Sequence, residues 1–301
     1  MKARIPFFFL FGLMVVLMGA TQVSTENDYP VLPELRVAKG EVIEYKVNFS
    51  FIPVGKAQIR IGKNLHKVNE RECYKIDIYG KTVGAIDWVA QVNDQWGGYI
   101  DTASALPHLT YRNIAEGNYR KKEITRFDHT TRMIEAKVLN NKTGEFKEPM
   151  YHQLPSWPMY DLVSGYLLLR GMDFSVYQVE DTITIPAFFE DTFYELNVLF
   201  KGREIINTKL GKINSLKLVP IMPDNQLFDG ENSISVWISD DDNKLPLRVE
   251  ANMFIGKAEV DILSAQGVLH EVNFKSTKKA GQTVNAPSQL ETIDNEEPVE
   301  N

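Results

Sequence analysis

Alternation of apolar and polar side chains is the feature that most constrains the fold of this chain. Between residues 41 and 51 every second side chain is apolar, and this apolar set is Ile43, Tyr45, Val47, Phe49 and Phe51. A period of two over this length is typical of a strand with one buried face. The same pattern recurs along most of the sequence, with turn residues between the repeats. We therefore expect a mainly antiparallel β protein whose curved sheets form a sandwich or an open barrel-like structure.

Turn signals such as Asn140-Asn141-Lys142-Thr143-Gly144 divide the alternating sequence into short strands. The strands are predicted near residues 41–51, 57–61, 74–78, 88–101, 108–114, 118–127, 132–139, 182–185, 193–200, 202–209, 213–220, 233–239, 245–254, 258–262 and 268–274. The pair Gly97-Gly98 is expected to bend or bulge its strand.

One stretch near the middle of the chain, Asp161 to Arg170, departs from the alternation and predicts a single central helix. Its apolar positions follow a helical period and are 162, 163, 166, 167 and 169. Pro158 precedes the helix and Gly171 ends it. A helix this short is marginal in water by itself, so burial against a concave sheet must hold it. We expect Leu162 and Leu169 to be buried there, and either Leu→Ala change to cost about 2–5 kcal/mol.

The two ends of the chain differ from the β-like middle. Lys2 and Arg4, the apolar run Phe7 to Met18 and the small residues behind it are typical of a secretory signal peptide, with an uncleaved membrane anchor as the alternative. Beyond Ser276 the sequence is polar and aperiodic, which favours disorder. The predicted organisation is a signal peptide at 1–21, a leader at 22–40, an N-terminal β part at 41–150, a linker and central helix at 151–173, a C-terminal β part at 174–275 and a disordered tail at 276–301.

Charge and cysteine content narrow the choice of partners. The formal charge of −7 becomes −9 once Lys2 and Arg4 leave with the signal peptide, which disfavours nucleic acid and anionic membrane surfaces. The mature chain has no second long apolar run, so the sequence predicts no membrane span in it. Cys73 is the only cysteine, so an internal disulfide and a cysteine metal cluster are excluded. The expected location is periplasmic or secreted.

Local motifs for catalysis are missing from the sequence. It has no Gly-x-Ser-x-Gly elbow, phosphate loop, dinucleotide fingerprint or His-Glu-x-x-His. The five histidines, at 66, 108, 129, 152 and 270, lack metal-ligand spacing. We therefore assign no catalytic residue, metal or cofactor, although a site assembled from distant strands stays open.

Four residues are candidates for binding. Asp161 and Ser164 share one side of the predicted helix and could line a polar pocket together with Arg170. The alternative is that they stabilise the helix, because the negative Asp161 at its start and the positive Arg170 at its end match the helix dipole. Trp237 faces away from its apolar strand neighbours and is the fourth candidate, although core packing is the usual role of such a residue. The acidic stretch Ser239 to Asn243 lacks calcium-loop spacing and is expected to be a turn.

An internal echo links the two β parts. Val54-Gly55-Lys56-Ala57 resembles Ile255-Gly256-Lys257-Ala258, and each segment follows a long alternating strand. This similarity indicates either that the two halves of the chain are similar and contain equivalent hairpins, or that the same common type of hairpin occurs twice.

The order and spacing of several segments resemble the bacterial family of exported proteins called domain of unknown function 3108. The matching segments are Gly40–Tyr45, Val54–Ala57, Asp161–Ser164 with Leu169-Arg170, Gly211–Ile213, and Val236–Asp241 with Leu245-Pro246. The resemblance spans roughly residues 38–274. It implies an exported protein of curved antiparallel sheets and implies no activity. The function that we expect is a non-enzymatic binding or scaffold module of the cell envelope, with an envelope protein, a glycan or a lipid as partner. A carrier of an apolar ligand such as lipid and a glycan-acting hydrolase or lyase are the alternatives.

Overall fold

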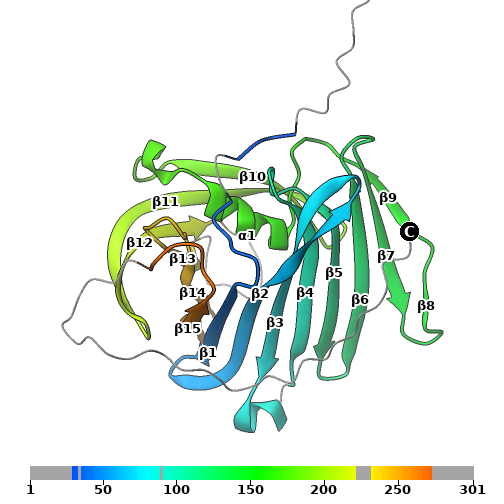
Figure 1. Cartoon of the computed structure of the whole chain (residues 1–301). Helices are drawn as coiled ribbons and strands as arrows, with labels where there is room; N and C mark the ends of the chain where they lie inside the picture. The colour runs from blue at the N-terminus through cyan, green and yellow to red at the C-terminus, as the bar shows by residue number, and fades with distance from the viewer. Residues whose placement is uncertain (1–28, 33–34, 89–90, 222–231, 273–301) are drawn as a thin grey trace, which may run out of the picture.

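A single open antiparallel sheet of fifteen strands makes up most of the described part of the protein (Figure 1). The computed structural model describes residues 29–32, 35–88, 91–221 and 232–272. The elements in chain order are β1 (Val42–Phe49), β2 (Ile52–Val68), β3 (Arg71–Thr82), the short 3-10 helix η1 (Gly84–Trp88), β4 (Asn93–Asp101), β5 (Pro107–Glu116), β6 (Tyr119–Asp128), β7 (Met133–Asn140), β8 (Glu145–Phe146), β9 (Met150–Gln153), α1 (Leu162–Gly171), the 3-10 turn η2 (Phe174–Val176), β10 (Thr182–Phe189), β11 (Thr192–Thr208), β12 (Gly211–Pro220), β13 (Ile234–Ser239), β14 (Pro246–Met253) and β15 (Gly256–Gln266). The predicted fold class is confirmed.

The order of strands across the sheet does not start with β1. It runs β10-β11-β12-β13-β14-β15-β1-β2 and onward to β8, with β9 pairing β7 beside β8. The first strand therefore lies between β15 and β2, so that the predicted N-terminal and C-terminal β parts share one continuous sheet. The echoed segments at Gly55 and Gly256 flank β1 on its two sides, because Val47 pairs with Gly55 in β2 and Phe49 pairs with Ala258 in β15.

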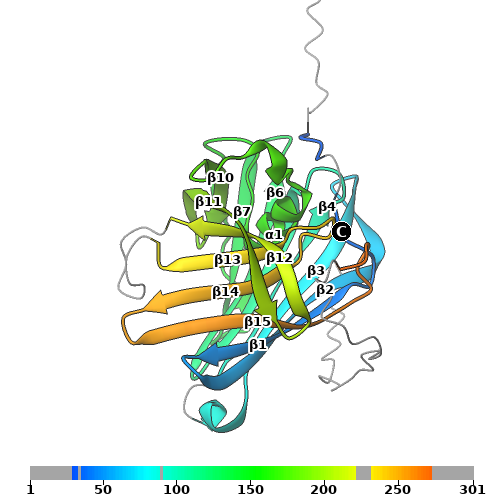
Figure 2. The same ribbon diagram turned by 90° about the vertical axis from the view of Figure 1, so that its left-hand side faces the viewer.

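The sheet curves until its two edges approach each other, as the two perpendicular views show (Figures 1 and 2). Tyr160 forms an isolated parallel bridge with Ala187 of β10. At the β10–β11 turn, Asp191 lies 3.6 Å from His152 of β9. The gap between the edges is thus spanned by side chains and by the segment before α1, while the sheet itself stays open.

Helix α1 lies inside the curve of the sheet, against β4, β5 and β10. It is the one α-helix among the described residues. Val163 and Leu167 are buried in the main apolar cluster, which also contains Phe174 beyond the helix and Phe200 of β11. Because apolar side chains from both ends of the chain meet around α1, the helix fills the interior that the curved sheet encloses.

The buried stripe of α1 differs from the predicted one. The prediction for Leu162 is wrong: its side chain is 50% exposed, whereas Leu167 is fully buried and Leu169 is half-buried. The buried positions are Val163, Ser164, Leu167, Arg170 and Gly171. These positions share one helical face. Leucines surround the axis of this helix, so the sequence does not show which face turns inward. The buried face includes Arg170, which was predicted only as a pocket residue or a match to the helix dipole, and it excludes Leu162.

Three further expectations need correction. No strand follows β15 in the described residues up to 272, although one was predicted at 268–274. Gly97 and Gly98 pair regularly with β3 and do not bulge. The glycine at 97 instead makes room for Tyr111, whose ring would lie 2.5 Å from a Cβ at that position. Phe51 does not continue the buried face of β1; it sits in the β1–β2 turn and is 89% exposed.

The remaining domain boundaries stay predictions. The predicted signal peptide at 1–21 and tail at 276–301 lie outside the described residues. Within the predicted leader, Leu32 and Leu35 pack on the main apolar cluster and Val37 belongs to it.

Candidate functional site

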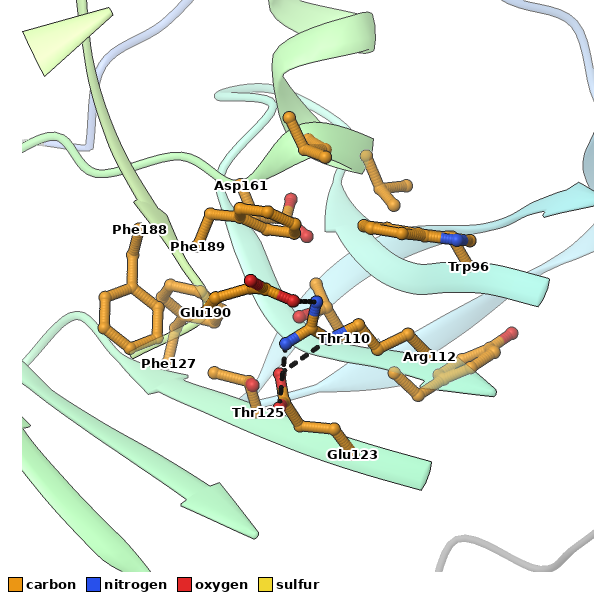
Figure 3. Close-up of a pocket in the computed structure, with 13 residues that line it drawn as sticks. Trp96, Thr110, Arg112, Glu123, Thr125, Phe127, Asp161, Phe188, Phe189 and Glu190 are labelled. Atoms are coloured by element: carbon orange, nitrogen blue, oxygen red, sulfur yellow. Dashed lines mark hydrogen bonds and ion pairs between the residues drawn. The ribbon is translucent and has the colours of Figure 1, made fainter. Parts of the chain in front are cut away.

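A small cleft opens between the start of α1, strands β4 to β6 and the β10–β11 turn (Figure 3). Its walls mix aromatic and charged side chains, chiefly Trp96, Arg112, Glu123, Asp161, Phe189 and Glu190. Its volume of about 30 Å³ leaves room for roughly one or two water molecules. The cleft is where one edge of the curved sheet, at β10, meets the inner strands β4 to β6 beside the helix.

Arg112 of β5 organises the charges of the cleft. Its Nε and Nη2 atoms donate to the two carboxylate oxygens of Glu123 at 2.9 Å each, and Nη1 donates to Glu190 at 2.8 Å. This planar, two-point geometry is a strong form of ion pair. Burial works against the charge of Arg112, but the hydrogen bonds to Glu123 and Glu190 outweigh it and raise the pKa of the arginine. Likewise burial would raise the pKa of Glu123, and the hydrogen bonds from Arg112 and Lys121 lower it.

Two stacked aromatic rings border this ion pair. The rings of Trp96 and Phe189 are nearly parallel, at 19°, with their centroids 5.5 Å apart. The guanidinium carbon of Arg112 lies 4.9 Å from the Phe189 centroid and 5.6 Å from the Trp96 centroid. Such contacts favour a cation over an aromatic face. Strands β4 and β5 are thereby joined to the β10–β11 turn by both charge and stacking.

Asp161 lies in the cleft and also caps α1. Its Oδ1 accepts from the backbone N–H of Ser164 at 2.8 Å, while the Ser164 hydroxyl accepts from the backbone N–H of Asp161 at 2.7 Å. This reciprocal pair is a capping box and satisfies N–H groups at the helix start. Burial raises the pKa of Asp161, and the hydrogen bonds from Ser164 oppose that rise. Ser164 is fully buried and is not part of the cleft lining.

Arg170 lies away from the cleft and is fully enclosed. Its five N–H donors are all used inside the protein: two on the Glu41 carboxylate, one on the Tyr166 hydroxyl, one on the Arg36 carbonyl and one on the Asn243 carbonyl. Burial alone would lower the pKa of Arg170, but Tyr166 and Glu41 raise it. The side chain therefore ties the helix to the leader, to the start of β1 and to the β13–β14 turn, and offers no free donor to a ligand.

Trp237 is also enclosed, on the face of β13 that carries charged neighbours. Only 7% of it is exposed, its indole N–H donates to Glu204 at 2.5 Å, and the Lys217 ammonium lies 5.0 Å from its ring centroid. Of the four residues predicted to bind a ligand, Asp161 alone reaches the cleft. A binding role for the four remains a prediction.

A second polar cluster consists of residues that were not predicted to lie together. His108 of β5 and His129, in the turn after β6, lie with their ring centroids 5.3 Å apart, and Tyr29 of the leader contacts both rings. Asp101 of β4 receives two hydrogen bonds from Arg71, at 2.6 and 3.2 Å. The His108 Nε2 atom is 3.6 Å from Asp101 and makes no hydrogen bond, and the His129 Nδ1 atom has none either.

The register of the β5–β6 hairpin was the signal that could have found this pair. Antiparallel pairing around the turn at Gly117 puts Leu109 opposite Arg126, so His108 and His129 fall at the same end of the hairpin. No group of three or more His, Cys, Asp or Glu residues in the described ranges is arranged to hold a metal ion. None of the helices described is long and apolar enough to cross a membrane.

Comparison with solved structures supports the architecture. The protein is similar to a β-barrel-like protein of the domain of unknown function DUF1849 from Brucella abortus, with a TM-score of 0.51, 8% sequence identity, and coverage of 77% of this chain and 98% of that one. A structure described as "a putative exported protein with YmcC-like fold" from Bacteroides fragilis gives a TM-score of 0.32 at 8% identity, covering 79% and 100% of the two chains. One described as "a putative lipoprotein" from Parabacteroides distasonis gives 0.27 at 7% identity, covering 78% and 99%.

Comparison of the sequence with curated proteins found no match. The model of one family, described as protein of unknown function (DUF3108), matches residues 44–262. That range runs from β1 into β15 and includes the helix, the cleft and both echoed hairpins. The chain therefore belongs to the DUF3108 family of proteins of unknown function.

Proposed function

We propose that this protein is an exported, non-enzymatic binding or scaffold module of the cell envelope. Export is inferred from the charged, apolar and small-residue segments that open the sequence. The observation that carries the scaffold role is the filled interior: α1 occupies the concave side of the sheet among the described residues, and the cleft beside it is small.

The filled interior argues against a carrier of lipid. Sites for small molecules usually have volumes of about 300–1,000 Å³ and bury most of the ligand. The cleft provides about 30 Å³, and its centre is occupied by the ion pairs of Arg112. An acyl chain could enter only if α1 left the sheet, which would expose Val163 and Leu167 and break the buried contacts of Arg170.

The pairing of the carboxylates argues against a hydrolase. General acid and base catalysis needs a carboxyl group free to exchange a proton with the substrate. Glu123 and Glu190 are held by Arg112, and Asp161 is held by the start of the helix. The carboxylates of the cleft thus form ion pairs and a helix cap that join structural elements.

Native mass spectrometry of the exported protein tests the proposal against the carrier. A scaffold is expected to give the mass of the polypeptide alone, and organic extraction of the sample should release no stoichiometric lipid. Lipid bound at one molecule per chain, and lost in a variant that fills the cleft such as Thr110→Phe, would overturn the scaffold role.

Neutral, nearly isosteric variants test the proposal against the enzyme. Asp161→Asn and Glu190→Gln keep the shape of the cleft but remove two of its carboxyl groups. In a strain whose envelope is weakened by loss of the protein, both should restore envelope integrity as well as the original chain does. A stable, exported variant that fails to restore it would favour catalysis, with circular dichroism of the purified variant as the control for folding.

A further inference from the structure

Five large apolar side chains are exposed on three neighbouring connections at one rim of the sheet. They are between 53% and 93% exposed and are Phe51 and Ile52 at the β1–β2 turn, Trp88 in η1, and Phe254 and Ile255 at the β14–β15 turn. We call these five residues the apolar rim. Single exposed apolar residues are common on proteins, but a group of five on adjacent turns marks an interaction surface.

The three connections are physically adjacent. The backbone N–H of Ser50 donates to the carbonyl of Lys257 at 2.6 Å, which joins the β1–β2 and β14–β15 turns. The N–H of Val83, just before η1, donates to the carbonyl of Val54 at 3.0 Å. In Figure 2 both turns point to the same side of the molecule and η1 lies below them. The apolar rim is therefore formed by neighbouring connections of strands that are distant in sequence.

A row of lysines lies a few residues behind the apolar rim. Lys46 of β1 is paired in register with Lys56 of β2, and Lys56 with Lys81 of β3. Directly opposed residues on antiparallel strands point to the same face, and like charges placed there destabilise a sheet. On the other side of Lys46 the row continues with Asp261, 3.4 Å from the ammonium, and with Arg248, bonded to that carboxylate at 2.6 Å.

The row therefore carries four cations and one carboxylate, an excess of three positive charges in a chain whose formal charge is −7. Closer to the rim, Lys257 lies 3.2 Å from Glu250 and 3.4 Å from Glu259, and these three residues together carry one negative charge, which leaves a local excess of two positive charges. The net negative charge of the whole chain disfavours an anionic surface as partner, but the net charge of the residues behind the rim is positive. A repulsive row of this kind is stabilised by an anionic partner.

We propose that the apolar rim and the lysine row dock the protein on an anionic lipid bilayer surface. Trp and Phe side chains at turn tips enter the interfacial layer of the bilayer, where amphipathic and aromatic groups are favoured. Lysines set back from the tips then lie at the level of the lipid phosphates, where each basic residue adds to binding. The docking deepens the proposed envelope role by naming its partner, and it rests on the proposed export of the chain.

Vesicle binding tests the docking without depending on the scaffold role. The probe is the exported form that begins near residue 22, because the apolar run before it would bind lipid by itself. Sedimentation with vesicles of phosphatidylethanolamine and phosphatidylglycerol is compared with vesicles of phosphatidylcholine alone, at low and high salt. The protein should bind the anionic vesicles, and the emission of Trp88, the most exposed tryptophan, should shift to the blue on binding.

Matched variants separate the two parts of the surface. Phe51→Ser with Phe254→Ser should weaken binding to anionic vesicles at least about tenfold, and Lys56→Gln with Lys81→Gln should do so about tenfold at low salt and less at high salt. Single changes of the same two kinds, away from the rim, serve as controls: the Tyr151→Ser variant on β9 and the Lys67→Gln variant at the far end of β2 should each bind as the original protein does. All four proteins must keep the original melting temperature.

Several results would overturn the docking. They are absence of binding to the anionic vesicles, unchanged binding in both double variants, or an equal loss in the Tyr151→Ser and Lys67→Gln controls. Failure here would leave the scaffold role untouched, because that role is decided by bound lipid and by the cleft carboxylates.

Discussion

The buried histidine of the second polar cluster should make the stability of this protein depend on pH in a defined window. Burial lowers the pKa of His129 from 6.5 to about 4. Its Nε2 atom lies 2.7 Å from the carbonyl oxygen of Pro107 and donates to it, so a second proton would have to enter at Nδ1. That atom is buried and has no hydrogen-bond partner. The charged imidazole is therefore poorly accommodated in the folded state.

The direction and the size of the effect follow from proton linkage. In the unfolded chain the histidine takes up a proton below about pH 6.5, whereas in the folded protein it does so only below about pH 4. Between these values the unfolded state holds more protons, so folding stability falls as the pH is lowered through the window. The interval of about 2.5 pH units, at 1.36 kcal/mol for each, corresponds to a loss of about 3 kcal/mol at pH 4 relative to pH 7.

The variant His129→Gln isolates this contribution. Glutamine stays neutral and can place its amide nitrogen near the same Pro107 carbonyl. Urea unfolding of both proteins at steps between pH 7 and pH 4 should show the variant gaining about 3 kcal/mol relative to the original protein over that range. Other titrating groups cancel in the difference, including Asp101, whose pKa burial would raise but the neighbouring His108 and the hydrogen bonds from Arg71 hold far below its ordinary value. Parallel stability curves would refute the reasoning.

Three further predictions concern packing and buried charge. Leu167→Ala should lower the free energy of unfolding by about 2–5 kcal/mol and Leu162→Ala by less than about 1 kcal/mol, because only the first is buried; equal shifts of the urea midpoint would contradict this. Gly97→Ala should cost about 1–3 kcal/mol, since its Cβ would lie 2.5 Å from a tyrosine ring, whereas Gly80→Ala on the neighbouring strand meets nothing within 4 Å and should be nearly neutral in thermal unfolding. Arg170→Met should cost about 3–5 kcal/mol by leaving its carboxylate partner buried and unpaired, and replacing that partner by leucine as well should recover much of the loss in denaturant unfolding; a double variant as unstable as the single one would argue against the unpaired charge as the cause.

The local parts of this fold were predictable from the sequence. Alternation depends on neighbouring residues alone, so the positions of β1, β5, β6 and β12 agree with the expected strands within a few residues. The start of α1 was predictable for the same reason, because Asp161 and Ser164 are three residues apart and cap the helix between themselves. The strand predicted after β15 is absent from the described residues, and the one predicted near 88–101 begins only at Asn93, because Trp88 belongs to η1.

Features assembled from distant strands could not be predicted. The Glu41–Arg170 pair joins residues 129 positions apart, and no local pattern marks either as buried. The exposure of Phe51 follows from the turn conformation at Ser50, whose φ of 55° ends the alternation one residue early. In the cleft, the partnership of Arg112 with Glu190 depends on how far the sheet curves, which is a property of the whole fold.

The position of β1 beside β15 makes the strand order a cyclic permutation of the chain order. Gly267, after β15, lies so close to Gly40, before β1, that an added Cβ would be 3.2 Å from the Gly40 carbonyl oxygen. A chain joined across this point and opened in the connection between Gln153 and Asp161 would keep every strand pair, and nearly all of its paired strands would follow one another in sequence. The natural chain instead leaves one edge of β1 unpaired until the last strand has been made, so the permuted chain should fold faster because its contacts are more local.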